Sequence, residues 1–126
     1  MNRLLLSAAL LVIAVGVAHS WLGERYIVRR LLRRNDLPEL FGDDSFTRQT
    51  VRFGWHLTTI AWFGLAAVLV LLSGALGDLR AGDAVIFAIA QTFVLSAALA
   101  LIVTRARHLS WIVFATIATL CLLAVS

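Results

Sequence analysis

The chain has 126 residues, of which 61% are hydrophobic and 14% are charged, whereas soluble domains are about half apolar and about a quarter charged. A water-soluble fold of this length exposes much of its surface, and these few polar residues cannot cover it. The formal net charge of +4 comes from arginines that lie between apolar runs. This pattern argues against a nucleic-acid-binding protein and is typical of a membrane protein.

Residues 4–22 form the first apolar run, which follows Arg3 and ends near Ser20 in a pattern like that of a signal peptide. Cleavage near Ser20 would leave the arginine-rich stretch that follows on the outer side of the membrane, against the usual charge distribution. The run is also long enough to span a bilayer. We therefore expect a retained transmembrane helix at 4–22.

The segment 23–50 contains most of the arginines and opens with the sequence GERYIVRRLLRR. Arginines recur in it at i, i+4 spacing with apolar residues between them. This spacing predicts a basic amphipathic continuation of the first helix, lying on the cytoplasmic head groups. Pro38 ends this continuation and Gly42 permits a turn. The candidate head-group contacts are Arg25, Arg29, Arg30, Arg33 and Arg34.

Three more apolar runs complete the chain, at 51–76, 81–103 and 109–125. The first of them follows the candidate N-cap residues Asp43, Asp44 and Ser45 and ends near Gly74 and Gly77. The last is the shortest, but at about 1.5 Å per residue it still crosses most of a hydrocarbon core. We expect a single transmembrane domain over residues 1–126, an all-α polytopic four-transmembrane-helix bundle.

Four spans place both termini on one side of the membrane, together with the short turn that contains Arg80. Seven arginines between residues 25 and 52 and two more at 105 and 107 lie on the opposite side, which has the higher positive charge. Because positive loops face the cytoplasm, both termini are expected to be extracytoplasmic.

Small residues four positions apart recur in the apolar runs, and in lipid such pairs let helices approach closely. They predict helix association, either within the bundle or, on a face left over, with a second copy or another membrane protein. The pairs are Ala14 with Ala18, Ala84 with Ala88, Ser96 with Ala100, and Ala115 with Thr119.

The three histidines, His19, His56 and His108, all fall near the expected cytoplasmic boundary, with Glu24 and Arg52 at the same depth. Ionisable groups at membrane depth are costly and often functional. One hypothesis is a ligand cluster of these histidines for haem iron or another transition metal, with Glu24 and Arg52 as supporting polar groups.

The alternative explanation is structural. Neutral histidines hydrogen-bond across helices, Glu24 pairs with Arg52 or a loop arginine, and tryptophans at this depth form an interfacial belt. His19 and Glu24 are five residues apart, about 140° around a helix. A metal site would therefore have to be assembled across helices.

A small transporter is a third hypothesis, which the sequence supports less well. Proton-coupled exporters need a carboxylate inside the membrane, and here Gln91 is the strongly polar residue at mid-depth. The chain contains none of the common catalytic motifs, such as a GxSxG, P-loop or HExxH sequence, so no catalytic residue is assigned.

Two short strings, AHSWLGER at 18–25 and RFGWHL at 52–57, resemble a type of small four-helix bacterial inner-membrane protein of unknown function. The resemblance covers the first half of the chain. It implies a bacterial inner membrane and carries over no catalytic residue.

The sequence therefore favours an accessory or scaffold component of the bacterial inner membrane. Its expected partners are the lipid bilayer and a second copy or a larger membrane complex, not nucleic acid. A haem- or metal-binding protein is the alternative, and a transporter is the less favoured one.

Overall fold

A computed structural model of the chain describes residues 1–77 and 81–125, and its regular elements within these ranges are all helical. The expected all-α fold is confirmed, because the described chain contains three long apolar helices and a shorter fourth one. The elements are α1 (Arg3–Leu22), the π-helical segment η1 (Gly23–Val28), α2 (Arg29–Leu31), α3 (Ser45–Leu72), α4 (Ala81–Val103) and α5 (Ser110–Ala124).

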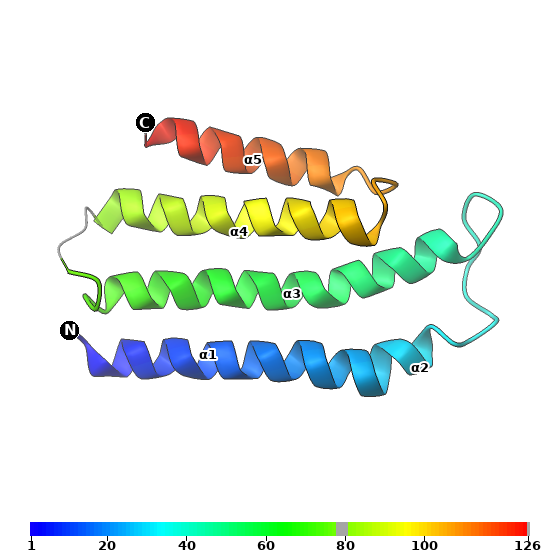
Figure 1. Ribbon diagram of the computed structural model, residues 1–126, viewed down its shortest axis with the longest axis horizontal. Helices are drawn as coiled ribbons and strands as arrows, with labels where there is room; N and C mark the ends of the chain where they lie inside the picture. Colours follow the sequence, from blue (N-terminus) through cyan, green and yellow to red (C-terminus); the bar gives the residue numbers. More distant parts are fainter. Residues whose placement is uncertain (78–80, 126) are drawn as a thin grey trace.

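The four main helices lie side by side in chain order, as a single layer (Figure 1). Backbone contacts join α1 to α3, α3 to α4, and α4 to α5, and within the described residues none joins α1 to α4 or to α5. The helices of the expected bundle therefore form an open row rather than a ring around a central core.

The two ends of the row have different connections, in agreement with the expected up-and-down topology. At one end, Arg107 donates a 3.0 Å hydrogen bond to the hydroxyl of Ser45, so the loop before α5 meets the start of α3. At the other end, the backbone N–H of Asn2 donates to the carbonyl of Ser73 at 2.6 Å. Both termini lie at this second end (Figure 1).

Helix α3 runs from Ser45 to Leu72, so it starts six residues before the predicted apolar run 51–76, with the N-cap candidate Asp44 at its N-cap position, and it ends close to the predicted stop at Gly74. Asp43 accepts hydrogen bonds from the backbone N–H and the hydroxyl of Ser45, and Asp44 pairs with Arg48 one turn later. These contacts start the helix among polar residues that hydropathy does not count. At the far end, Gly74 adopts a φ of +71°, which ends the helix as glycine commonly does.

The helix expected over GERYIVRRLLRR is present as a continuation of α1. It passes through η1, ends at Leu31 and keeps the same axis direction as α1 (Figure 1). Its end lies before Pro38, and residues 32–44 form the loop in which Gly42 has a φ of +94°. Together, α1, η1 and α2 make one 29-residue helical stretch, which at about 1.5 Å per residue is longer than a hydrocarbon core is thick.

The α1–α3 contact is built from small residues facing aromatic ones. Ala9, Gly16 and Gly23 lie seven residues apart and are buried. A Cβ at Gly16 would lie 2.8 Å from the Phe63 ring, and one at Gly23 would lie 2.2 Å from Trp55 Nε1. At both positions a Cβ would force the facing ring to move, and the larger movement would be needed at Gly23.

Some of the small residues predicted to form helix contacts are buried, and others are exposed. Ser96 and Ala100 are buried, as expected for a packing face of α4. Ala14 is exposed, so the face of α1 that meets α3 is the one of Gly16. Thr119 is also exposed.

Candidate functional site: a polar cluster between α1 and α3

Three polar side chains form a chain of hydrogen bonds across the α1–α3 contact. The hydroxyl of Ser20 lies 2.9 Å from His56 Nδ1 and 2.7 Å from the hydroxyl of Thr59. Thr59 in turn donates to the carbonyl of Gly16 at 3.4 Å and is 5% exposed. These bonds favour one alignment of the two helices, because a shift of one helix along the other would separate the paired polar groups.

Glu24 extends this chain toward the arginine-rich end of the row. Its carboxylate lies 3.0 Å from an Arg52 guanidinium nitrogen, 3.4 Å from His56 Nε2 and 3.4 Å from Arg29 Nε. His56 therefore connects Ser20 on one side with Glu24 on the other. The predicted supporting pair of Glu24 and Arg52 is present as an ion pair.

The carboxylate of Glu24 is carried by the π-helical segment. The backbone N–H of Arg29 bonds to the carbonyl of Glu24, five residues earlier, which is the defining contact of a π-helix. Single π-helical turns are frequent at functional sites. Here the turn begins where Ser20 and Glu24, four residues apart, both reach His56.

His19 belongs to a different group of side chains. Its ring stacks on Trp55 with centroids 4.6 Å apart and planes 2° from parallel, and Trp62 lies against it at 5.0 Å. His19 Nε2 lies 3.3 Å from the carbonyl oxygen of Trp55, and the indole N–H of Trp55 donates to the carbonyl of His19 at 3.2 Å. This reciprocal contact occupies the space that Gly23 leaves open.

His108 lies at the turn before α5, away from both of the other histidines. Its Nδ1 is 2.8 Å from the hydroxyl of Ser110, and its ring stacks on Phe46 and contacts Phe53. The three histidines thus have separate partners. In residues 1–77 and 81–125, no group of three or more His, Cys, Asp or Glu side chains is placed to hold a metal ion.

The cofactor hypothesis therefore stays a prediction from the sequence. His19 and His56 line different surfaces of the α1–α3 pair, one with Trp55 and Tyr26 and the other with Ser20. Both imidazoles take part in hydrogen bonds to protein groups. Both ring nitrogens of His56 have protein partners, Nδ1 in Ser20 and Nε2 in Glu24, so a metal bound by His56 would have to displace one of them.

The five candidate head-group arginines also differ from one another. Arg34 donates two hydrogen bonds to Asp36 and lowers the pKa of the Asp36 carboxyl to about 2. The side chains of Arg30 and Arg33 are exposed and, within the described chain, have no ion-pair partner. Arg25 and Arg29 instead line a recess beside the polar cluster.

This recess has a volume of about 600 Å³ and lies between η1, the end of α1, and α3. Its walls combine the polar cluster with the side chains of Val17, Trp21 and Phe63 and with the two arginines. The lining residues are Val17, Ser20, Trp21, Glu24, Arg25, Arg29, His56, Thr59 and Phe63.

Sequence reasoning missed Ser20 and Thr59 as members of this site. The signal was present in the spacing: Ser20 and Glu24 are four residues apart, as are Arg52 and His56, so each pair shares a helix face. A hydroxyl in an apolar helix commonly bonds to its own backbone, which is why Ser20 attracts little notice in the sequence.

Comparison of the chain with protein families, with curated proteins and with solved structures gives no match in any of the three. No activity, ligand or partner is therefore carried over from a relative.

Proposed function

We propose that this chain is an accessory or scaffold protein of the bacterial inner membrane, which works by associating with other membrane-embedded chains. The resemblance of 18–25 and 52–57 to small inner-membrane proteins supports the location. The excess of arginine at the end with loops 32–44 and 104–109 supports a cytoplasmic position for those loops, with both termini outside.

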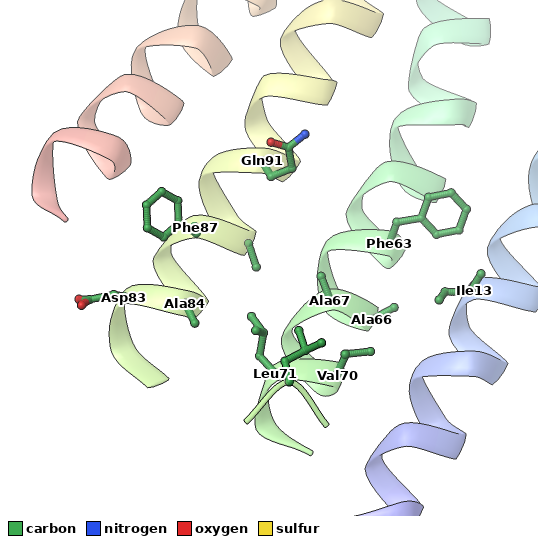
Figure 2. Close-up of a pocket in the computed structure, with 12 residues that line it drawn as sticks. Ile13, Phe63, Ala66, Ala67, Val70, Leu71, Asp83, Ala84, Phe87 and Gln91 are labelled. Atoms are coloured by element: carbon green, nitrogen blue, oxygen red, sulfur yellow. The ribbon is translucent and has the colours of Figure 1, made fainter. Parts of the chain in front are cut away.

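The open row supports an associating role because it leaves a groove beside α3. This apolar groove has a volume of about 870 Å³ and is bounded by α1, α3 and α4 (Figure 2). Ala66 and Ala67 of α3 and Ala84 and Ala88 of α4 lie along it. Small side chains let a neighbouring transmembrane helix approach the backbone closely, so the groove suits a helix better than a bulky surface would.

Gln91 is the single observation that carries the proposal. It lines the same groove (Figure 2) and is exposed. No group in residues 1–77 and 81–125 donates to its amide or accepts from it. In hydrocarbon, where water supplies no partner, an unpaired amide is unfavourable. The amide therefore calls for a polar partner from outside the chain.

A second copy of the chain supplies that partner. A glutamine amide contains both donors and an acceptor, so two Gln91 side chains related by a two-fold axis along the membrane normal satisfy each other. In a two-fold interface the same residues meet from both copies. Ala84 and Ala88 lie on the same helical face as Gln91, at i, i+4 and i+7. The proposed association is a dimer packed through α4.

Replacing Gln91 with leucine should weaken the dimer about 3- to 18-fold, since interhelical hydrogen bonds in membranes contribute about 0.6 to 1.7 kcal/mol. Energy transfer between labelled copies in vesicles, measured at several protein-to-lipid ratios, gives the dissociation constant. Ala88→Leu, which fills the groove, should weaken association further.

Thr119→Leu is the matched control, because Thr119 is exposed on α5 and bonds only within its own helix, to the carbonyl of Ala115. It should dimerise like the wild type. A wild-type chain that stays monomeric at high density in the vesicles, or equal dissociation constants for Gln91→Leu and wild type, would contradict the proposal.

A further inference from the structure

The recess beside the polar cluster has features of a ligand site that the proposed dimer does not use. We propose that it binds one anionic phospholipid from the bilayer, with the phosphate at Arg25 and Arg29 and an acyl chain along Val17 and Phe63. The recess lies toward loop 32–44, while the dimer groove lies toward the termini, and Phe63 is the one lining residue that both contain. The two proposals therefore stand independently.

The charges around the recess favour an anion. Arg25 has no ion-pair partner within the described residues, and its guanidinium lies over the rings of Trp21 and Tyr26 at 5.9 and 5.5 Å. The Arg29 contact with Glu24 is long, at 3.4 Å, whereas Arg52 approaches the same carboxylate to 3.0 Å. The guanidinium groups of Arg25, Arg29 and Arg52 carry three positive charges, and the Glu24 carboxylate carries one negative charge. Two positive charges therefore remain for a ligand.

Arginine also fits the chemistry of the group. Its planar guanidinium donates two parallel hydrogen bonds to phosphate oxygens, a geometry that lysine cannot reproduce. Arg25 lies in η1 and Arg29 directly follows it, and both side chains line the recess. A single phosphate diester can therefore contact both.

The apolar walls indicate that the anion has a hydrocarbon chain. Val17 and Phe63 line the recess below the arginines, and Phe63 continues into the large apolar groove. Trp21, which is 61% exposed, lies at the same recess, and tryptophan is enriched at the level of the lipid head groups. A soluble anion would use the arginines but not these walls, whereas a phospholipid uses both.

The test measures lipid binding to the full chain by native mass spectrometry, with phosphatidylglycerol and phosphatidylcholine as probes. The wild type should retain one phosphatidylglycerol and bind it about tenfold or more tightly than phosphatidylcholine, since each basic residue near an anionic head group contributes on the order of 1 kcal/mol. The double variant Arg25→Gln, Arg29→Gln should lose this preference.

The double variant Arg30→Gln, Arg33→Gln is the matched control, because it removes the same charge from side chains outside the recess. It should keep the bound phosphatidylglycerol. Equal losses in the two double variants would show only a diffuse attraction of the basic segment for anionic lipid and would overturn the proposal. Equal binding of the two lipids by the wild type would overturn it as well.

Two further measurements separate this site from simpler explanations. Arg25→Gln alone removes no ion pair within the described chain, so it tests the site even if the double variant fails to fold, and it should reduce the lipid preference severalfold. An excess of inorganic phosphate should leave the bound lipid in place, because it lacks the acyl chain. Displacement of the lipid by phosphate would overturn the assignment to a phospholipid.

Discussion

Replacing Gly23 with alanine should destabilise the α1–α3 contact by about 1 to 3 kcal/mol, the usual cost of inserting an atom into a packed site. The new Cβ would lie 2.2 Å from Trp55 Nε1. Moving the indole away would disturb its stacking on His19 and its hydrogen bond to the carbonyl of His19. Relief of the clash would require separating α1 from α3 or breaking this reciprocal contact.

The control is Gly54→Ala, one residue before Trp55 and on the same helix. No atom lies within 4 Å of a Cβ built at Gly54, and alanine favours a helix by about 1 kcal/mol over glycine. Gly54→Ala should therefore be neutral or slightly stabilising. Unfolding in mixed detergent, followed by tryptophan fluorescence, compares the two variants. Equal stabilities for Gly23→Ala and wild type would mean that Trp55 does not occupy this position.

Replacing Glu24 with glutamine should cost about 1 to 2 kcal/mol of stability. The change removes the negative charge that Arg52, Arg29 and His56 share, so the neighbouring guanidinium groups repel one another without compensation. The Arg52 side chain is 43% exposed, and partial screening by water keeps the effect below that of a fully buried pair.

A double-mutant cycle isolates the pair from other effects of the substitution. Glu24→Gln and Arg52→Gln, alone and combined, should show a coupling energy of about 0.5 to 1 kcal/mol, measured by the same unfolding assay. Glu39→Gln is the control, since Glu39 is exposed and has no ion pair in the described chain. A coupling energy near zero would contradict the ion pair.

The number and composition of the helices could be predicted from the sequence, because apolar runs of this length have few alternatives. The run 81–103 coincides with α4, whereas α3 starts six residues before the predicted residue 51. The first turns of α3 are polar, so hydropathy alone does not include them in the helix. The N-cap candidates Asp43 and Asp44 mark this start in the sequence.

The arrangement of the helices was harder to predict. In lipid, a helix face that packs on another helix is about as apolar as one that faces acyl chains, so the sequence does not distinguish a closed bundle from an open row. The face of Gly16 was missed in favour of the Ala14 and Ala18 pair, although Ala9, Gly16 and Gly23 repeat every seven residues. In the structure, Phe63 packs at Gly16 and Trp55 packs at Gly23, so this repeat marks the face that contacts α3.

The candidate site was predicted in part. The sequence placed Glu24, Arg52 and the three histidines at one depth; of these, Glu24 contacts Arg52 and His56, whereas His19 and His108 have other partners. Depth alone does not reveal which side of a helix a residue faces, and His19 faces Trp55 rather than His56. The hypothesis that His19 and His56 bind one metal required the two side chains to face each other, which depth does not show.

The open row also bears on how the chain is made. Because each of the main helices packs on the one that precedes it, the backbone contacts between helices can form in chain order during synthesis. The ring contacts of Phe46 and Phe53 with His108, and of Phe53 with Phe114, wait for the last part of the described chain. Chains dominated by contacts between sequence neighbours have short loops to close and fold quickly. Synthesis and assembly can then proceed in the same direction, one hairpin at a time.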